Sequence, residues 1–365
     1  MNDRGDKEVT IDRRTWLRGG LAAGAALAAS TLAGKASAGP QTLPGAEDLI
    51  ASPPAGFTPL KLPGRVVKVT RGTSFPALMQ PNLLWPKPEV ARQMLERAMT
   101  DLTGAPNMID SMKRFIHPDD VVAIKVNGIA GSNMSVAWEL ILPVVEAVIG
   151  VGVAPSRITV YEQFPNFLSS TRVGLQGNAL PSGVLARYHS NQLSRMRDVE
   201  VVRGVPTRYA RFLTDATALI NLALIKDHSI CGYTGLLKNI THGSIVNPSA
   251  HHGNHANPQI ALLFGHPIVQ SRVRLHITDG FKLNYDGGPL DKKPQCRIPH
   301  GAVYVTTDAV AMDTVGWQVV EQARRDHGIK SLTEAGRAPA YLQTAADLRV
   351  GTYDLNAIRL QSTSL

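Results

Sequence analysis

Cysteine is scarce in this chain of 365 residues, which contains only Cys231 and Cys296. No C-x-x-C pair is present, so we expect neither an iron–sulfur cluster nor a structural zinc knuckle. In an oxidising compartment the two cysteines can form one disulfide, and otherwise they are buried free thiols. The sequence leaves these two alternatives open.

Aromatic residues and long apolar runs are also rare. Aromatic residues make up 5% of the chain, and the basic residues do not form long runs. We therefore do not expect a nucleic-acid interface, which needs stacking side chains and a basic stripe. No stretch of eighteen or more strongly apolar residues occurs, which excludes a protein with several membrane spans. The hydrophobic fraction of 44% instead predicts a globular protein with a sizeable core.

Residues 1–38 have the composition of an export signal. The segment RRTWLR at residues 13–18 resembles the twin-arginine motif, a weakly apolar stretch follows, and residues 36–38 read ASA, a pattern that signal peptidase cleaves. We predict cleavage after Ala38, transport by the twin-arginine translocation machinery, and a periplasmic or secreted mature protein without a stable membrane span. An ordinary amphipathic N-terminal helix is the alternative.

The mature chain is expected to stay basic. Removal of six basic and four acidic residues with the leader lowers the net charge from +9 to +7. Such a charge suits a small anionic molecule or an anionic membrane surface, and it can also serve solubility alone. The twin-arginine route carries folded proteins, so it favours a bound metal or organic cofactor without identifying one.

The rest of the chain predicts an α/β fold with a mostly parallel sheet and helices on both faces. Residues 39–64 are a Pro- and Gly-rich lead-in, and residues 65–365 form one α/β domain. The predicted strands are 66–69, 121–126, 157–161, 218–225, 273–278 and 302–306, and the predicted helices are 88–102, 135–148 and 309–325. Strands that are apolar along their whole length are typical of parallel sheets covered on both faces.

Polar residues follow several of these strands. Ligands in such sheets bind beyond the carboxyl ends of the strands, so these residues are the candidate site. They include Asn127, Glu162, the segment KDH at 226–228, and Asp279. Neither G-x-G-x-x-G nor a P-loop motif occurs, so a dinucleotide or P-loop site has no support.

A set of lysines and asparagines predicts an anion site. Lys226 ends a buried strand, where an ammonium group is poorly solvated and seeks an anion, a carbonyl or a carboxylate. A helix start after Gly235 would add backbone N–H donors. We expect a carboxylate or phosphate of a small anionic substrate to be held by these residues: Lys125, Asn127, Lys238 and Asn239. The alternative is that each lysine pairs with Asp279, Asp308 or Asp313.

The candidate catalytic residues are Lys226, Asp279 and Glu162. Asp279 is expected directly after a strand, where it would serve as a ligand or general base. Glu162 has a similar position at another strand end. Asp308 instead fits the N-cap of a helix, which is a structural role.

Histidines are concentrated in one region, with seven of the eleven falling within 49 residues. His251 and His255 are four residues apart, but Pro248 and Pro258 favour a loop over a helix here. Two readings stay open. Either His228, His251 and His255 hold a divalent transition metal, or the histidines belong to a polar surface loop.

Six segments resemble the family known as domain of unknown function family 362. Their order and spacing span residues 65–360, and they read VAIKVN (122–127), LINLALIKDH (219–228), GLLKN (235–239), DG (279–280), GGP (287–289) and TDAVAMDTVG (307–316). The resemblance implies a site at the lysine, asparagine, histidine and aspartate positions. Some members carry ferredoxin-like segments, which implies redox chemistry for them, but this chain lacks those cysteines.

Three functions remain open. The chain is expected to be a metal-assisted enzyme acting on a small anionic substrate, with the metal polarising a carbonyl or activating water. One alternative is a periplasmic protein that binds a metal or an anion without chemistry, and another is an assembly factor for an exported redox protein. An enzyme is favoured because several differently charged groups follow the strands.

Overall fold

The computed structural model describes residues 47–174, 177–189 and 199–365. The predicted signal peptide, residues 1–38, lies outside the described residues. The strands are β1 (Arg65–Thr70), β2 (Val122–Lys125), β3 (Ile158–Glu162), β4 (Leu185–Tyr188), β5 (Val199–Val202), β6 (Val205–Thr207), β7 (Ala218–His228), β8 (Gly232–Thr234), β9 (Val273–Asn284), β10 (Arg297–Thr306) and β11 (Arg359–Ser364).

The α-helices among the described residues differ widely in length. They are α2 (Phe75–Leu78), α3 (Pro88–Thr103), α4 (Met108–Met112), α5 (Trp138–Val151), α6 (Pro165–Ser170), α7 (Arg211–Thr214), α8 (Leu236–Ile240), α9 (Gln259–Gly265), α10 (Pro267–Gln270), α11 (Ala309–Asp326) and α12 (Tyr341–Asp347). No helix in the described part of the chain combines the length and hydrophobicity needed to cross a membrane.

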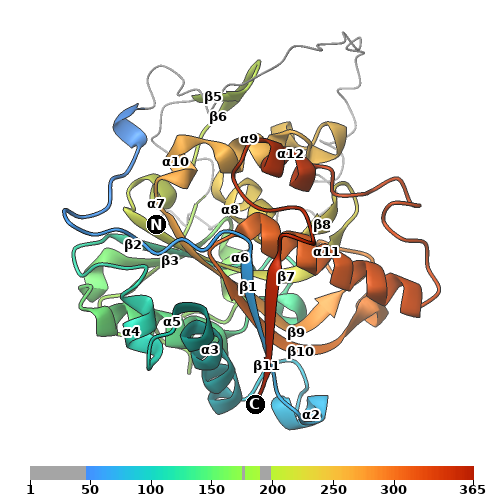
Figure 1. Ribbon diagram of the computed structural model, residues 1–365, viewed down its shortest axis with the longest axis horizontal. Helices are drawn as coiled ribbons and strands as arrows, with labels where there is room; N and C mark the ends of the chain where they lie inside the picture. The colour runs from blue at the N-terminus through green and yellow to red at the C-terminus, as the bar shows by residue number, and fades with distance from the viewer. Residues whose placement is uncertain (1–46, 175–176, 190–198) are drawn as a thin grey trace, which may run out of the picture. The chain divides into compact units, whose positions relative to one another are not determined.

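One mostly parallel sheet organises the described residues, which confirms the predicted fold class. Its strand order is β11-β1-β10-β9-β7-β2-β3-β4, with β8 paired to β7. The run from β9 through β7, β2 and β3 to β4 is parallel, whereas β10 is antiparallel to both β9 and β1. The C-terminal strand β11 runs parallel to β1 at the opposite edge (Figure 1).

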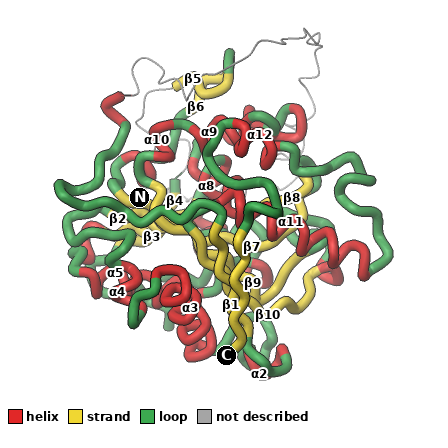
Figure 2. Tube along the Cα trace, in the orientation of Figure 1, coloured by secondary structure: helices red, strands yellow, loops and turns green. Residues whose placement is uncertain are grey.

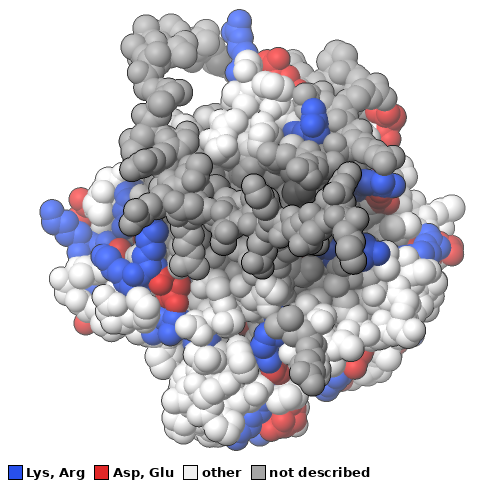
Figure 3. Space-filling model, turned by 180° about the vertical axis from the view of Figure 1, so that it is seen from behind, with Lys and Arg blue, Asp and Glu red and all other residues white. Residues whose placement is uncertain are grey.

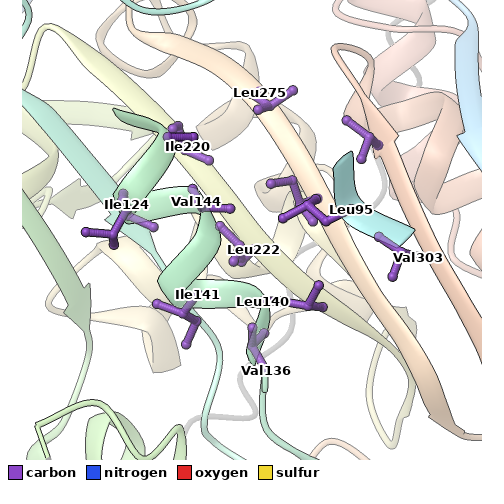
Figure 4. Packing of buried hydrophobic residues seen from close by; sticks show 14 of the residues in the cluster. Leu95, Ile124, Val136, Leu140, Ile141, Val144, Ile220, Leu222, Leu275 and Val303 are labelled. Carbon is purple, nitrogen blue, oxygen red and sulfur yellow. The ribbon is translucent and has the colours of Figure 1, made fainter. Parts of the chain in front are cut away.

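Helices cover both faces of this sheet, as Figures 1 and 2 show. On one face, α3, α4 and α5 pack on a cluster that includes Leu95, Ile124 and Leu222 (Figure 4). On the other face, α8, α9, α11 and α12 bury a second cluster that includes Leu219 and Ile260. All eleven residues of β7 are buried, because both of its faces are covered. This is the physical reason why residues 218–225 are apolar apart from Asn221.

Two strands continue well past their predicted C-terminal ends, and β10 begins five residues before its predicted start. β7 continues through Lys226 to His228 because β8 pairs with its last three residues. β9 continues to Asn284 because β10 returns beside it as an antiparallel hairpin. The expectation that Asp279 directly follows a strand is therefore wrong, since Asp279 lies within β9. Helix α5 also begins three residues later than predicted, at Trp138.

Some smaller expectations are settled by the structure. Cys231 and Cys296 are buried free thiols, so the disulfide alternative is not seen. The segment 248–256 forms two short 3₁₀ turns, which confirms the predicted loop. Asp308 caps helix α11 by accepting a hydrogen bond from the backbone N–H of Ala311. On the face shown in Figure 3, the visible Lys and Arg side chains are scattered, and several lie beside Asp or Glu.

Candidate functional site

Five of the predicted site residues come together at the carboxyl ends of β2, β3 and β7. We call this set the lysine–asparagine cluster, and it consists of Lys125, Asn127, Glu162, Lys226 and Asn239. All five side chains are buried. Lys125 and Glu162 are the last residues of their strands, and Asn239 is contributed by α8. The cluster therefore lies where ligands bind in parallel sheets.

Glu162 neutralises Lys125. The Lys125 ammonium lies 3.3 Å from Oε2 of Glu162, and both side chains are almost fully buried. Oε1 of Glu162 accepts a hydrogen bond of 2.9 Å from the backbone N–H of Gly128, and Oε2 accepts one from that of Gln163. Since both oxygens are engaged, Glu162 holds Lys125 and two backbone N–H groups in place. This arrangement gives Glu162 a positioning role rather than that of a general base.

A chain of amide hydrogen bonds leads away from Lys226. Its ammonium donates to Oδ1 of Asn127 at 2.7 Å, and Nδ2 of Asn127 donates to Oδ1 of Asn239 at 3.0 Å. Nδ2 of Asn239 donates to Oδ1 of Asn221 and to the backbone oxygen of Leu222. Because a backbone oxygen only accepts, it fixes the orientation of Asn239, and through it that of Asn127. Asn127 therefore presents an oxygen to Lys226.

The charge of Lys226 has no carboxylate partner within 4.0 Å in the described residues, in contrast to that of Lys125. Burial lowers the pKa of Lys226 to about 7, an effect that Glu162 opposes and the charge of Lys125 reinforces. The amine and the ammonium are then both populated near neutral pH. Such a lysine can bind an anion in one form and accept a proton in the other.

A second set of polar side chains adjoins the first. We call it the histidine cluster, and it consists of Lys238, His228, His242, His251 and His252. The ammonium of Lys238 lies 2.9 Å from Nε2 of His252, whose ring stacks with that of His228 at 5.9 Å between centroids. His242 contacts the rings of both His251 and His252. Lys238 thus faces histidines, whereas its neighbour Asn239 faces the lysine–asparagine cluster.

Hydrogen bonds fix the proton positions of two of these rings. Nδ1 of His228 accepts from the backbone N–H groups of Ile230 and Cys231, so its proton is on Nε2. Nδ1 of His252 donates to the backbone oxygen of Pro248, so its Nε2 accepts from Lys238. Burial holds the pKa of His228 well below its usual range, and the charges of Lys238 and other neighbours add to this effect. Both rings are therefore neutral.

The three predicted metal ligands do not form a ligand set. The described residues contain no group of three or more His, Cys, Asp or Glu side chains that could hold a metal ion. Nε2 of His251 shares a hydrogen bond with the hydroxyl of Thr207, and exposed His255 uses Nδ1 to donate to the backbone oxygen of Ile230. His228 presents an N–H donor rather than a free lone pair. These contacts favour a hydrogen-bonding role for the histidines.

Asp279 is not part of either cluster. Its Oδ2 accepts a hydrogen bond of 2.8 Å from the backbone N–H of Ala137, the N-cap residue of α5, and its Oδ1 accepts one from Phe281. Burial raises the pKa of Asp279, which these hydrogen bonds oppose. The carboxylate stabilises the start of α5, so the structure gives it a structural role instead of the expected catalytic one.

The helix start expected to bind a substrate anion is already occupied. Asp313 on α11 accepts hydrogen bonds from the backbone N–H groups of Leu236 and Leu237, at 2.7 and 2.9 Å. Gly235 is required here, since a Cβ at that position would lie 2.3 Å from Oδ1 of Asp313. The backbone of α8 therefore binds an internal carboxylate. The N–H groups of Leu236 and Leu237 are therefore not available to a substrate anion.

Sequence reasoning missed several residues that support the site. Asn221 links Asn239 to Nδ1 of His276 on β9, and His189 donates from Nε2 to the backbone oxygen of Gly243. A Cβ on Gly243 would lie 2.9 Å from Cε of Lys125. Asn221 was detectable as a polar residue inside an otherwise apolar strand. His189 and Gly243 carry no comparable signal in the sequence.

These features define an α/β protein with a mostly parallel sheet and a buried, lysine-rich cluster at the carboxyl ends of its strands. The chain belongs to the family described as a domain of unknown function (DUF362), whose profile matches residues 122–318. No curated protein matches the chain. Among solved structures, a protein from Thermotoga maritima aligns with 11% identity and a TM-score of 0.39, covering 66% of this chain and 58% of that protein.

Proposed function

We propose that this protein binds a small anionic molecule through Lys226 and Lys238 and acts on it as an enzyme. One observation carries the proposal. Both lysine residues are buried, with relative exposures of 2% and 7%, and neither ammonium group has a carboxylate within ion-pair distance in the described residues. A buried charge without a counter-charge is unfavourable. A bound carboxylate or phosphate would supply the missing negative charge.

The surroundings of His228 support a shared binding site. The charges of Lys238 and Lys226 both lower the pKa of His228, so both ammonium groups act on the same ring. Lys226 and His228 are two residues apart on β7, which places them on one face of the strand. Within the described residues, the Nε2–H of His228 has no hydrogen-bond acceptor. Two cations and one N–H donor can therefore bind one anion.

An enzyme fits better than a simple binding protein because of Lys226. Anion binding alone does not require a group that titrates near neutral pH, whereas the pKa of Lys226 lies near 7. A lysine that gains and loses a proton at neutral pH suits general acid–base chemistry. Asn127 keeps the amine in place in both protonation states, since its Oδ1 accepts a hydrogen bond from either form.

Thermal unfolding with a panel of anions tests this function. We expect phosphate and small carboxylates to raise the melting temperature of the wild-type protein, and we expect Lys226→Met and Lys238→Met to remove this shift. The exposed Lys61 provides a matched control, and Lys61→Met should keep the full shift. Stabilisation that survives in both buried-lysine variants would contradict the proposed site. Stabilisation without turnover of any anion in a metabolite pool would identify a binding protein instead.

We also propose that the protein is exported by the twin-arginine route. The proposal rests on the arginine pair and the ASA pattern of residues 1–38. An exported enzyme would reach its anionic substrate outside the cytoplasm, and its anion site would be formed by the folded mature chain.

A further inference from the structure

We propose that Lys226 is a nucleophile that forms an imine with an anionic carbonyl compound, such as a 2-oxo acid. This inference rests on the proposed anion site and names its substrate class. The anionic group would bind at Lys238 and His228, and the carbonyl carbon would face Nζ of Lys226.

The contacts of Lys226 differ from those of two other buried lysines, Lys125 and Lys282. Lys125 is paired with Glu162, and Lys282 donates to the backbone oxygens of Leu84 and Asn133, which gives it a structural role. Within the described residues, Lys226 makes one hydrogen bond, to a neutral amide oxygen. No carboxylate forms an ion pair with its nitrogen in the described residues, and the charge of Glu162, which favours the ammonium, acts from a greater distance. The lone pair of Lys226 is therefore available for attack when the proton is lost.

The neighbouring cation favours the reactive amine. Lys125 reaches Oδ1 of Asn239 at 3.1 Å, and Lys226 reaches the same amide pair through Asn127. The charges of Lys125 and Lys226 repel each other. This repulsion disfavours the charged form of Lys226, which has no ion-pair partner in the described residues. Burial lowers the pKa of Lys226 to about 7. A desolvated lysine beside another cation is a recognised way to activate an amine nucleophile.

The proposed reaction needs no oxidant or reductant. The lone pair of Nζ attacks the carbonyl carbon and forms a C–N bond, while the carbonyl π electrons move to oxygen. The two hydrogens of the amine leave with that oxygen as water, and a C=N double bond remains. Lys238 and the Nε2–H of His228 would hold the anionic group during these steps. The imine then serves as an electron sink for the next bond cleavage.

Reductive trapping tests this inference directly. The full-length mature protein is treated at pH 7.5 with glyoxylate or pyruvate and cyanoborohydride, and the modified lysines are mapped by peptide mass spectrometry. Glycolate and lactate, which lack the reactive carbonyl, are the matched controls. We expect modification of Lys226 by the two oxo acids well before that of exposed Lys61, and none with the hydroxy acids. Absence of an adduct at Lys226, or equal labelling of Lys61, would overturn the proposal.

Two variants separate nucleophilicity from anion binding. Lys226→Arg keeps the charge and a donor for Asn127, so it should retain thermal stabilisation by glycolate but form no adduct at residue 226. Suppose that the wild type forms no adduct, while glycolate stabilises the wild type and Lys226→Arg but not Lys238→Met. That result would overturn the imine proposal and support the anion site. If the wild type shows neither thermal stabilisation by glycolate nor an adduct at Lys226, both proposals are overturned.

The second variant, Asn127→Asp, places a carboxylate beside Lys226. The groups around Lys226 are then Lys125, Glu162, Asp291, His228 and the new carboxylate. The added negative charge favours the ammonium, so the pH at which trapping reaches half its maximal rate should move upward. A trapping profile that does not move would show that the modified amine is not the one bound to residue 127.

Discussion

At Lys226, burial is the main reason that the charged form is disfavoured, and the pKa of about 7 has a consequence for stability. In the unfolded chain the pKa of this lysine returns to about 10.5. Between about pH 7 and pH 10.5, the unfolded state therefore binds a proton that the folded state has lost. The contribution of Lys226 to the free energy of unfolding must therefore rise with pH between these two values.

The variant Lys226→Met removes this contribution. We expect the free energy of unfolding of the wild type, minus that of the variant, to increase by a few kcal/mol between pH 7 and pH 10. Urea unfolding of both proteins at several pH values measures it. Parallel pH profiles would mean that the pKa of Lys226 is the same in the folded and unfolded states.

At Glu162, the prediction concerns a buried ion pair. Glu162→Gln leaves the Lys125 ammonium without its counter-charge, and we expect a loss of about 3 kcal/mol in the free energy of unfolding. The double variant Lys125→Met with Glu162→Gln should recover part of that loss, because no unpaired charge remains. Chemical denaturation of the four proteins in this cycle gives the coupling. Simple additivity of the two single effects would argue against a direct pair.

At the scale of single elements, α8 carries residues of both clusters, since Lys238 and Asn239 are adjacent on it. Its start is bound by Asp313 on α11. Asp313→Ala leaves the N–H groups of Leu236 and Leu237 unsatisfied in the interior, so we expect a destabilisation of about 3 kcal/mol. Asp326→Ala, at an exposed position at the end of α11, should change the free energy of unfolding by no more than about 0.5 kcal/mol.

The Asp313→Ala variant should also weaken anion binding, because α8 positions Lys238. Thermal shifts with phosphate compare Asp313→Ala with Asp326→Ala and with the wild type. A destabilised Asp313 variant that keeps the full phosphate shift would show that the start of α8 does not position the site.

The elements themselves were largely predictable from the sequence. β7 has seven apolar residues among its first eight, with Asn221 as the exception, and helix α11 shows a clear apolar stripe behind its Asp308 cap. The full extent of β9 was not predicted, because polar residues interrupt the apolar pattern of 279–284, and this segment is a strand through its pairing with β10 and β7. A polar strand end looks like a loop until its partner strand is known.

The site was predictable in part, and the reason is distance along the chain. Polar residues near predicted strand ends can be identified locally, and the prediction grouped Lys125, Asn127, Lys238 and Asn239 as anion ligands, with Lys226, Asp279 and Glu162 as catalytic residues. Their partners cannot be identified in that way. Asp279 binds the start of a helix 142 residues away, and its role depends on the folded chain. For His228, His251 and His255 the sequence left a metal site and a polar loop as alternatives, because spacing does not reveal which ring nitrogen carries the proton.

At the scale of the whole molecule, the export proposal makes its own prediction. Replacing Arg13 and Arg14 together by lysine should block transport by the twin-arginine machinery, so that uncleaved protein accumulates inside the cell. Cell fractionation with mass spectrometry of the N-terminus measures this, with Arg18→Lys as the control. In the exported protein we expect the chain to begin at Gly39. Equal export of the double-lysine variant would contradict the twin-arginine assignment.

We propose that Lys226 and Lys238, both in the ammonium form, bind the anion. The most direct test is calorimetric titration with sulfate at pH 7.5, carried out in buffers with different ionisation enthalpies. Sulfate does not titrate near this pH, so any proton taken up on binding is bound by the protein and not by sulfate. We predict that sulfate binds the wild type with uptake of a fraction of one proton, and that Lys226→Arg, whose side chain stays charged, binds sulfate without this uptake. Sulfate binding without proton uptake, or equal uptake by the variant, would contradict the account.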